Sequence, residues 1–189
     1  MLNLISYKKF VTLKNGTRVL IRFLKNGDQT EVIRFFQTAP PEDIRYLTYF
    51  SANPRHLDSF LHHIDYAENI PLVAWEIEKG SIIGAAFFSR GQGAINHIGE
   101  VHCIFVARPF QKLGLGTMLL DECIYLACRM DMLCLTARIA TELKDSIRAF
   151  RNKGFETKTM LENYFRCRNG DLCNVMLMTL PLRPENVEF

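Results

Sequence analysis

One short segment, Gln-Lys-Leu-Gly-Leu-Gly-Thr at positions 111–117, constrains the fold of this 189-residue chain more than any other. The run before it, residues 99–107, is dense in β-forming residues and ends at Arg108-Pro109, where proline stops ladder pairing. The segment after it repeats apolar residues at helical spacing, namely Met118, Leu119, Leu120, Cys123, Ile124 and Ala127. A strand therefore passes through a glycine-rich turn directly into a helix.

Such a turn is suited to binding a pyrophosphate. The first N–H groups of a helix lack partners within the helix, and the positive end of the helix dipole lies at the same place. Gly114 and Gly116 let a diphosphate approach the backbone, while Lys112 adds charge at the rim and Thr117 adds a hydroxyl. Gln111, Leu113 and Leu115 complete the predicted site through their backbone groups.

Other glycine-rich phosphate motifs fit this segment less well. A P-loop requires lysine before Thr117, where Gly116 stands, and a dinucleotide fingerprint requires glycine or alanine at Leu119. An isolated pair of glycines usually does no more than tighten a strand-to-helix corner. The functional interpretation therefore depends on the surrounding elements.

The remaining sequence predicts an α/β chain with a mixed sheet. Residues 17–24 alternate as a first strand. Helical spacing is expected across the region 28–69, with one helix capped by Asp28, a second starting at Pro40 and a third after Asn53-Pro54. Paired strands follow at 71–78 and 81–89, then the elements around the glycine turn, a strand at 132–139, a helix ending at Gly154, and a hairpin around Asn169-Gly170. We find no repeat or linker, so residues 1–189 are expected to form one domain.

Composition names no partner but excludes several. The net charge is +3, with 23 basic and 20 acidic residues and no clustering of the kind that binds nucleic acid. No apolar run reaches the length of a signal peptide or membrane span, so we expect a cytoplasmic protein with no membrane partner. The six cysteines lack a CxxC pair and are expected to be buried thiols, and His56, His62 and His63 suggest no metal site.

At this point the sequence resembles a known family, the GNAT (GCN5-related N-acetyltransferase) superfamily. Gln111-x-x-Gly114-x-Gly116 matches its Q/R-x-x-G-x-G/A signature, and residues 146–155 resemble its helix that ends in Lys-x-Gly-Phe or Lys-Gly-Phe. The resemblance extends along the order of elements from Leu13 to Leu180. It implies the GNAT fold: a mixed, mostly antiparallel sheet of six to seven strands flanked by helices, with strands four (99–107) and five (132–139) splayed apart.

The resemblance also implies the donor and its site. Acetyl-CoA is the expected acyl donor, bound by a core at residues 97–155. The backbone of strand four would hold the pantetheine arm at Ile104, Phe105 and Val106, residues 111–117 would hold the pyrophosphate, and Ser146 and Phe150 of the following helix would complete the site. No metal is expected.

The acceptor chemistry requires a base, because only an unprotonated amine attacks a thioester. Glu100 lies eleven residues before Gln111, the spacing at which histone-type lysine acetyltransferases of this superfamily carry their glutamate base. Other bacterial protein acetyltransferases place theirs one residue nearer, where this chain has Val101, and a shift of one position points a side chain to the opposite face unless a bulge intervenes. A surface carboxylate at the start of the strand, with no catalytic role, is an equally good interpretation of Glu100. His102 is the alternative base on the same face.

The usual tyrosine acid of the superfamily is replaced here by Phe150. The thiolate would then leave as such or take a proton from another donor, for which Tyr164 is a candidate. Cys103 is a nucleophile candidate by position only, since a free cysteine is most often a small buried hydrophobe.

Three functions follow from these residues. The first is transfer of an acetyl group to a primary amine, with a protein lysine suggested by the position of Glu100. The second is acylation of a small amine such as a polyamine, amino acid or antibiotic, and the third is a non-catalytic acyl-CoA sensor. The helical region 28–69 is expected to wall the acceptor site with residues such as Tyr46, Tyr49, Phe50 and Phe60, and family habit suggests a homodimer.

Overall fold

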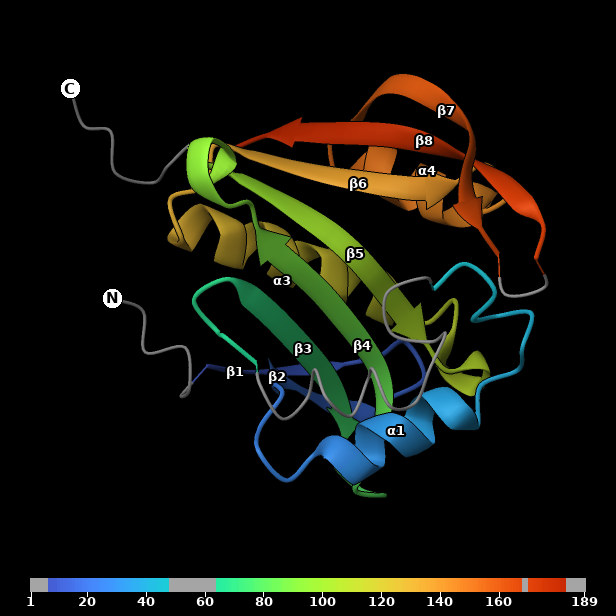
Figure 1. Cartoon of the computed structure of the whole chain (residues 1–189). Helices are drawn as coiled ribbons and strands as arrows, with labels where there is room; N and C mark the ends of the chain where they lie inside the picture. Colours follow the sequence, from blue (N-terminus) through green and yellow to red (C-terminus); the bar gives the residue numbers. More distant parts are fainter. Residues whose placement is uncertain (1–6, 48–63, 168–169, 183–189) are drawn as a thin grey trace.

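A single mixed sheet organises the described part of the chain, with the strand order β1-β2-β3-β4-β5-β6-β8-β7 (Figure 1). The structure is a computed structural model, and it describes residues 7–47, 64–167 and 170–182. Its elements, in chain order, are β1 (Lys8–Thr12), β2 (Arg18–Phe23), α1 (Gln29–Gln37), β3 (Asn69–Glu76), β4 (Ser81–Arg90), the 3-10 helix η2 (Gly93–Ile95), β5 (Ile98–Val106), the 3-10 helix η3 (Arg108–Phe110), α3 (Leu115–Arg129), β6 (Cys134–Ala140), α4 (Lys144–Asn152), β7 (Glu156–Arg166) and β8 (Leu172–Pro181).

The sheet confirms the expected fold class. All neighbouring strands pair antiparallel except β5 and β6, which pair in parallel. The described residues hold eight strands, where six to seven were expected, because Lys8–Thr12 forms an unforeseen first strand. The turn at Asn15-Gly16 joins it to β2, with Gly16 at a φ of 85° that a glycine adopts without strain.

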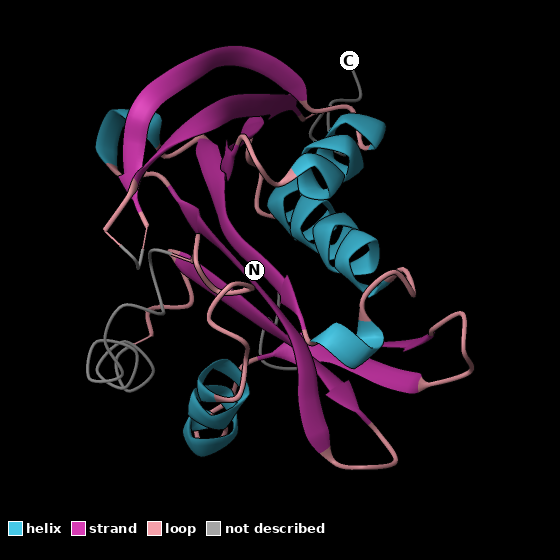
Figure 2. Cartoon of the chain, turned by 90° about the vertical axis from the view of Figure 1, so that its right-hand side faces the viewer, coloured by secondary structure: helices cyan, strands magenta, loops and turns pink. Residues whose placement is uncertain are grey.

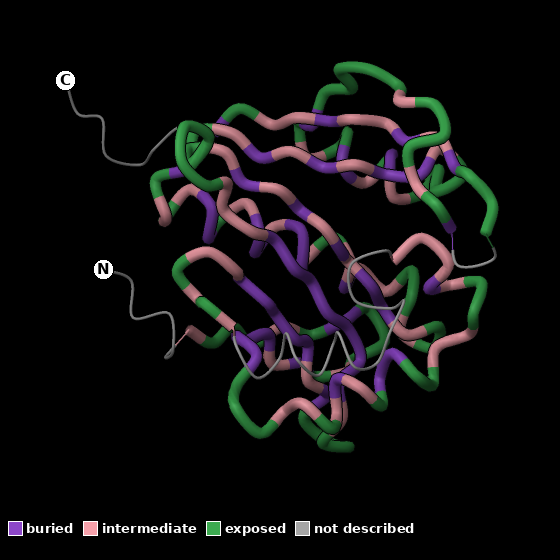
Figure 3. Tube along the Cα trace, in the orientation of Figure 1, coloured by how far each residue is buried: buried purple, intermediate pink, exposed green. Residues whose placement is uncertain are grey.

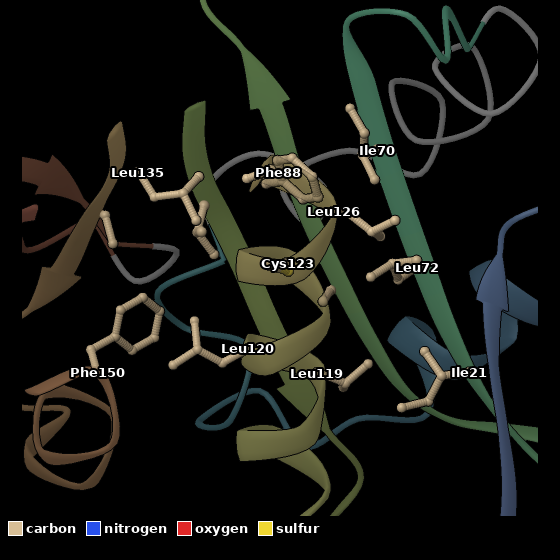
Figure 4. Packing of buried hydrophobic residues seen from close by; sticks show 14 of the residues in the cluster. Ile21, Ile70, Leu72, Phe88, Leu119, Leu120, Cys123, Leu126, Leu135 and Phe150 are labelled. Atoms are coloured by element: carbon tan, nitrogen blue, oxygen red, sulfur yellow. The ribbon is translucent and has the colours of Figure 1, made fainter. Parts of the chain in front are cut away.

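Helices cover both faces of the sheet. Figure 2 shows α1 on the opposite side of the sheet from the longer helix α3. Apolar residues of α3 pack against the central strands, and Figure 4 shows Leu119, Cys123 and Leu126 beside Ile70, Leu72 and Phe88. Gly84 of β4 permits this close packing, because a Cβ atom there would lie 3.1 Å from Leu115 Cδ2. The larger core cluster therefore lies between α3 and the central strands.

A second, smaller cluster lies on the α1 side. Val32, Phe35 and Phe36 of α1 pack there with Phe87 of β4 and Phe105 of β5. Figure 3 shows burial concentrated in the central strands, whereas the edge strand β7 is largely exposed. The central strands β4 and β5 are thus fixed from both faces.

Two predictions from the sequence need correction. The helix expected to start at Pro40 is absent from residues 40–47, which form turns closed by bonds such as Asp43 N–H to Pro40 O at 3.0 Å. Cys167 and Cys173 were expected to be free thiols but form a disulfide beside the turn of the β7–β8 hairpin. The helix predicted after Asn53-Pro54 lies outside the described residues, as do Tyr49, Phe50, Phe60 and all three histidines at 56, 62 and 63.

The four remaining cysteines form no disulfide. Cys103 and Cys123 are buried as expected, whereas Cys128 and Cys134 are only half-buried. No helix among the described residues has both the length and the apolarity needed to cross a membrane.

Candidate functional site

The turn between β5 and α3 directs its backbone amides outward. Lys112 and Gly114 both adopt positive φ, 61° and 97°, which reverses the chain sharply before the first helical residue, Leu115. Met118 N–H bonds to Gly114 O at 3.0 Å, and within the described residues no backbone carbonyl accepts a bond from the amides of residues 112–117. Several N–H groups at the positive end of a helix are therefore available to an anion.

Gly116 has no structural need to be glycine. Its φ is not positive, and a Cβ atom there would meet only Val106 Cγ2 at an ordinary 3.8 Å. By contrast, Gly114 is required by its left-handed conformation, and Leu115 is required as a fully buried core residue. The absence of a side chain at Gly116 keeps the backbone open to an approaching ligand, which fits a diphosphate.

Gln111 anchors the turn to the strand that precedes it. Its side-chain Nε2 donates to the carbonyl of Val106, the last residue of β5, at 3.0 Å. Lys112 and Thr117 are exposed beside the turn. The predicted pyrophosphate residues therefore lie together, with Gln111 fixing the backbone rather than extending a side chain toward the ligand.

β5 and β6 diverge, as the resemblance implied. Their parallel pairing runs from Ile98 opposite Cys134 only to Val101 opposite Ala137, although both strands continue beyond it. The ribbons lie side by side at one end and separate toward the other (Figure 1). From residue 102 to 106, β5 pairs with β4 along one edge, while its other edge has no strand partner in the described part of the chain. Backbone groups alternate along a strand, and Ala107 N–H bonds to Ile83 O of β4, so those of Ile104 and Val106 point to the opening, where the Val106 carbonyl accepts the bond from Gln111.

A β-bulge in β5 decides which side chains face the acceptor. Phe87 of β4 is opposite Cys103, yet the next residue, Phe88, is opposite Val101, so His102 is the extra residue. Val101 packs in the core cluster on the α3 side, whereas Cys103 packs in the cluster on the α1 side. Glu100, adjacent to Val101, accordingly points away from α3. The alternative base position at 101 is occupied by a buried valine.

Glu100 is held in an ion pair across the opening. Arg138 of β6 donates from Nε to Glu100 Oε1 at 2.6 Å, and its Nη2 contacts the same oxygen. Arg138 Nη1 also donates to the hydroxyl of Tyr164 on β7. The side chains of Glu100 and Arg138 are 28% and 29% exposed to solvent, so a solute can reach both.

His102 lies against the same carboxylate. Its Nδ1 is 3.7 Å from Glu100 Oε1, its Nε2 is 2.6 Å from Ser89 Oγ, and its ring stacks on Phe87. Burial lowers the pKa of His102 from its ordinary value of 6.5, Glu100 opposes that change, and Arg138 adds to it. The imidazole is therefore neutral at pH 7.

The other predicted residues have mainly structural surroundings. Burial raises the pKa of Cys103 to about 12, which keeps the thiol protonated and unsuited to nucleophilic attack. Phe150 is buried in the core (Figure 4). Its ring packs edge-on against Phe155, with ring centroids 4.8 Å apart. Ser146 is half-exposed on the first turn of α4.

Sequence reasoning missed Arg138 and Ser89. Arg138 is the only charged residue in the otherwise apolar or neutral run 132–140, which is the signal that was available. A cation in a strand interior needs a carboxylate partner, but the sequence alone does not identify Glu100 as that partner. Ser89 carried no comparable signal.

A cavity of about 460 Å³ lies elsewhere, between α1, the start of β4 and η3. Its lining includes Phe35, Ile82 and Phe105 but none of residues 111–117 and neither Glu100 nor His102. Within the described residues, no three His, Cys, Asp or Glu side chains gather as metal ligands would.

Comparisons with known proteins agree with this geometry. The profile of the acetyltransferase (GNAT) family matches residues 32–155. The fold is similar to the GNAT domain of PAT from S. lividans (TM-score 0.73, 19% identity, covering 93% of this chain and 97% of that one) and to a ribosomal-protein-alanine N-acetyltransferase from Brucella melitensis (0.72, 22%, 86% and 99%). A GNAT superfamily phosphinothricin acetyltransferase from Sinorhizobium meliloti, solved in complex with AcCoA, is also similar (0.72, 19%, 89% and 94%). No curated protein sequence matches closely enough to add to these comparisons.

Proposed function

The chain belongs to the acetyltransferase (GNAT) family, and from that premise we propose that it transfers an acetyl group from acetyl-CoA to a primary amine by direct attack, with Glu100 as the base. One observation carries the proposal. The unpaired edge of β5, residues 102–106, connects the amide-rich turn at one end with Glu100 at the other. At about 3.3 Å per residue, this edge is about 16 Å long, which suits an extended arm between a pyrophosphate and a thioester.

The donor is held mainly by backbone groups in this proposal. The amides of residues 112–117 bind the pyrophosphate, with Lys112 and Thr117 at the rim, and the unpaired edge at Ile104, Phe105 and Val106 hydrogen-bonds the pantetheine amides. Ser146 and Phe150 border the same side from α4. The arrangement leaves the thioester near the bulge, where the side chains change faces.

The reaction requires one proton transfer from the acceptor. The amine nitrogen attacks the thioester carbonyl carbon, a C–N bond forms, the C–S bond breaks, and the thiolate leaves. The proton lost by the amine passes to Glu100, directly or through a water molecule, and the neutral ring of His102 lies beside it as an alternative acceptor. Phe150 supplies no proton, so the thiolate leaves as such or is protonated by Tyr164, whose hydroxyl contacts Arg138.

A protein lysine and a small amine are both compatible acceptors for this chemistry. The test is CoA release from acetyl-CoA with a panel of amines, measured for the wild type and Glu100→Gln. General-base removal is expected to lower kcat/KM by about 10²–10⁴-fold while the Kd for acetyl-CoA is unchanged. Glu156→Gln, an exposed carboxylate on β7, is the matched control. Full activity of Glu100→Gln would remove the base assignment, and no turnover of any acyl-CoA with any amine would remove the proposed function.

A further inference from the structure

Arg138 occupies a distinctive position at the opening between β5 and β6. It is the first residue of β6 beyond Ala137, where pairing with β5 ends. Its side chain reaches back to β5 and contacts Glu100, and it also contacts Tyr164 on the edge strand β7. The guanidinium therefore lies beside the group that the proposed function assigns as the base.

Arg138 retains unused hydrogen-bonding capacity. A guanidinium carries more N–H donors than the contacts to Glu100 and Tyr164 use. Glu100 likewise bonds through Oε1, and its Oε2 makes no hydrogen bond to a described residue. Both side chains are partly exposed. One anionic oxygen and further cationic N–H groups of this partly exposed pair thus remain available to a solute.

The ion pair between Glu100 and Arg138 disfavours an acceptor that carries positive charge alone. A lysine side chain or a polyamine that approaches Glu100 also approaches the guanidinium of Arg138, and like charges repel at such short range. Among the described residues, Glu42 and Asp43 are paired with Arg108 and Asp171 is paired with Arg45, so these carboxylates are already compensated. A solute with adjacent positive and negative groups matches the pair on both sides.

We propose that the acceptor is an α-amino acid or a close analogue, a primary amine with a carboxylate one carbon away, and that Arg138 is the specificity-determining residue that binds this carboxylate. The inference rests on the proposed function of the same site. The amine lies against Glu100, and the carboxylate accepts hydrogen bonds from the free edge of the guanidinium. Arginine is suited to this role because its planar fork binds carboxylates through two N–H groups.

The test compares matched acceptors as substrates of the wild-type 189-residue chain. Each standard α-amino acid is assayed beside its α-carboxamide, which keeps the amine and side chain but removes the negative charge, and a capped lysine peptide and a polyamine are included. At least one free amino acid is expected to turn over, with kcat/KM about 100-fold above its amide. The product mass confirms acetylation of the α-amine.

Substitution of Arg138 then separates recognition from support of Glu100. Arg138→Gln is expected to abolish the preference for acid over amide, so that the two members of a pair become equivalent, and Arg138→Lys is expected to keep part of it. A residue that only positions Glu100 would lower both rates together and leave their ratio unchanged. Arg18→Gln, an exposed arginine on β2 paired with Glu78, is the control and should retain the wild-type ratio.

Three results would overturn the inference. These are amides as good as acids in the wild type, acetylation of the lysine peptide or polyamine with the amino acids inert, and an unchanged acid-to-amide ratio in Arg138→Gln. Each of them leaves the proposed acetyl transfer standing. Failure of every amine to turn over removes the proposed function itself and this inference with it.

Discussion

The donor turn and the acceptor face are built from different parts of the polypeptide. The turn at residues 111–117 uses contiguous backbone, and the side chain it requires most is Leu115, which anchors it in the core. The acceptor face uses side chains from four strands, Ser89, Glu100 and His102, Arg138, and Tyr164, which meet only because β5 bulges and separates from β6. A site made of backbone depends on conformation, whereas a site made of side chains depends on residue identity.

This difference predicts that the two sites respond separately to mutation. The largest effect on acetyl-CoA binding is expected for Gly116→Val, because a branched side chain there would cover the neighbouring backbone amides, and the fold itself does not require glycine at this position. Loss of charge-assisted hydrogen bonds of this kind costs about 2 kcal/mol, or about 30-fold in the Kd for acetyl-CoA. Isothermal titration calorimetry measures this change in the Kd. An unchanged Kd would show that the turn does not hold the pyrophosphate.

Gly116→Ala controls for the fold. Alanine is a better helix former than glycine by up to about 1 kcal/mol, so the Tm should not fall even though acetyl-CoA binding weakens. Weaker binding with an intact Tm separates loss of the ligand site from loss of structure.

On the acceptor side, His102 is expected to have an effect of intermediate size on how stability depends on pH. Burial lowers its pKa in the folded state, so the folded protein resists protonation that the unfolded chain accepts below pH 6.5. The folding free energy associated with neutral His102 is therefore fully present above that pH and is lost as pH falls through the folded-state pKa. The Tm of the wild type should drop more steeply than that of His102→Gln between pH 7 and pH 5. Parallel curves would contradict this role of burial.

The smallest effect is expected for Ser89→Ala, which removes the hydroxyl beside His102 Nε2. One lost hydrogen bond costs about 1 kcal/mol, so kcat/KM should fall by no more than about 5-fold with no change in acetyl-CoA affinity. Thr136→Val, on β6 of the same sheet, is a comparable hydroxyl deletion outside the His102 contact. Equal effects of both variants would show that Ser89 has no particular role in orienting the imidazole.

The donor turn could be predicted from sequence because its determinants are local. Gly114 and Gly116, the β-rich run before them and the apolar spacing after them all lie within about thirty consecutive residues. Their conformations follow from rules that act over a few residues, such as the need for glycine at positive φ. The separation of β5 from β6 was predicted from the family resemblance, and the structure also shows it.

The acceptor face could not be predicted in the same way because its contacts are long-range. The choice between positions 100 and 101 depended on a bulge that no local pattern indicated, and Arg138 lies 38 residues from its partner Glu100. Similarly, β1 is short and mostly exposed, so it lacks the apolar alternation of a buried strand. Residues 40–47 begin with a proline pair and acidic residues typical of a helix start, yet Arg108 holds Asp43 and Glu42 in a turn.

A crystal structure of the protein with acetyl-CoA tests the central claim most directly. The account predicts that the pyrophosphate contacts the amides of residues 112–117, that the pantetheine arm follows β5 at Ile104 to Val106, and that the thioester lies beside the bulge at His102, within reach of Glu100. Acetyl-CoA bound elsewhere, for example in the cavity between α1 and η3, or bound with its thioester on the α3 side of the sheet, would contradict it.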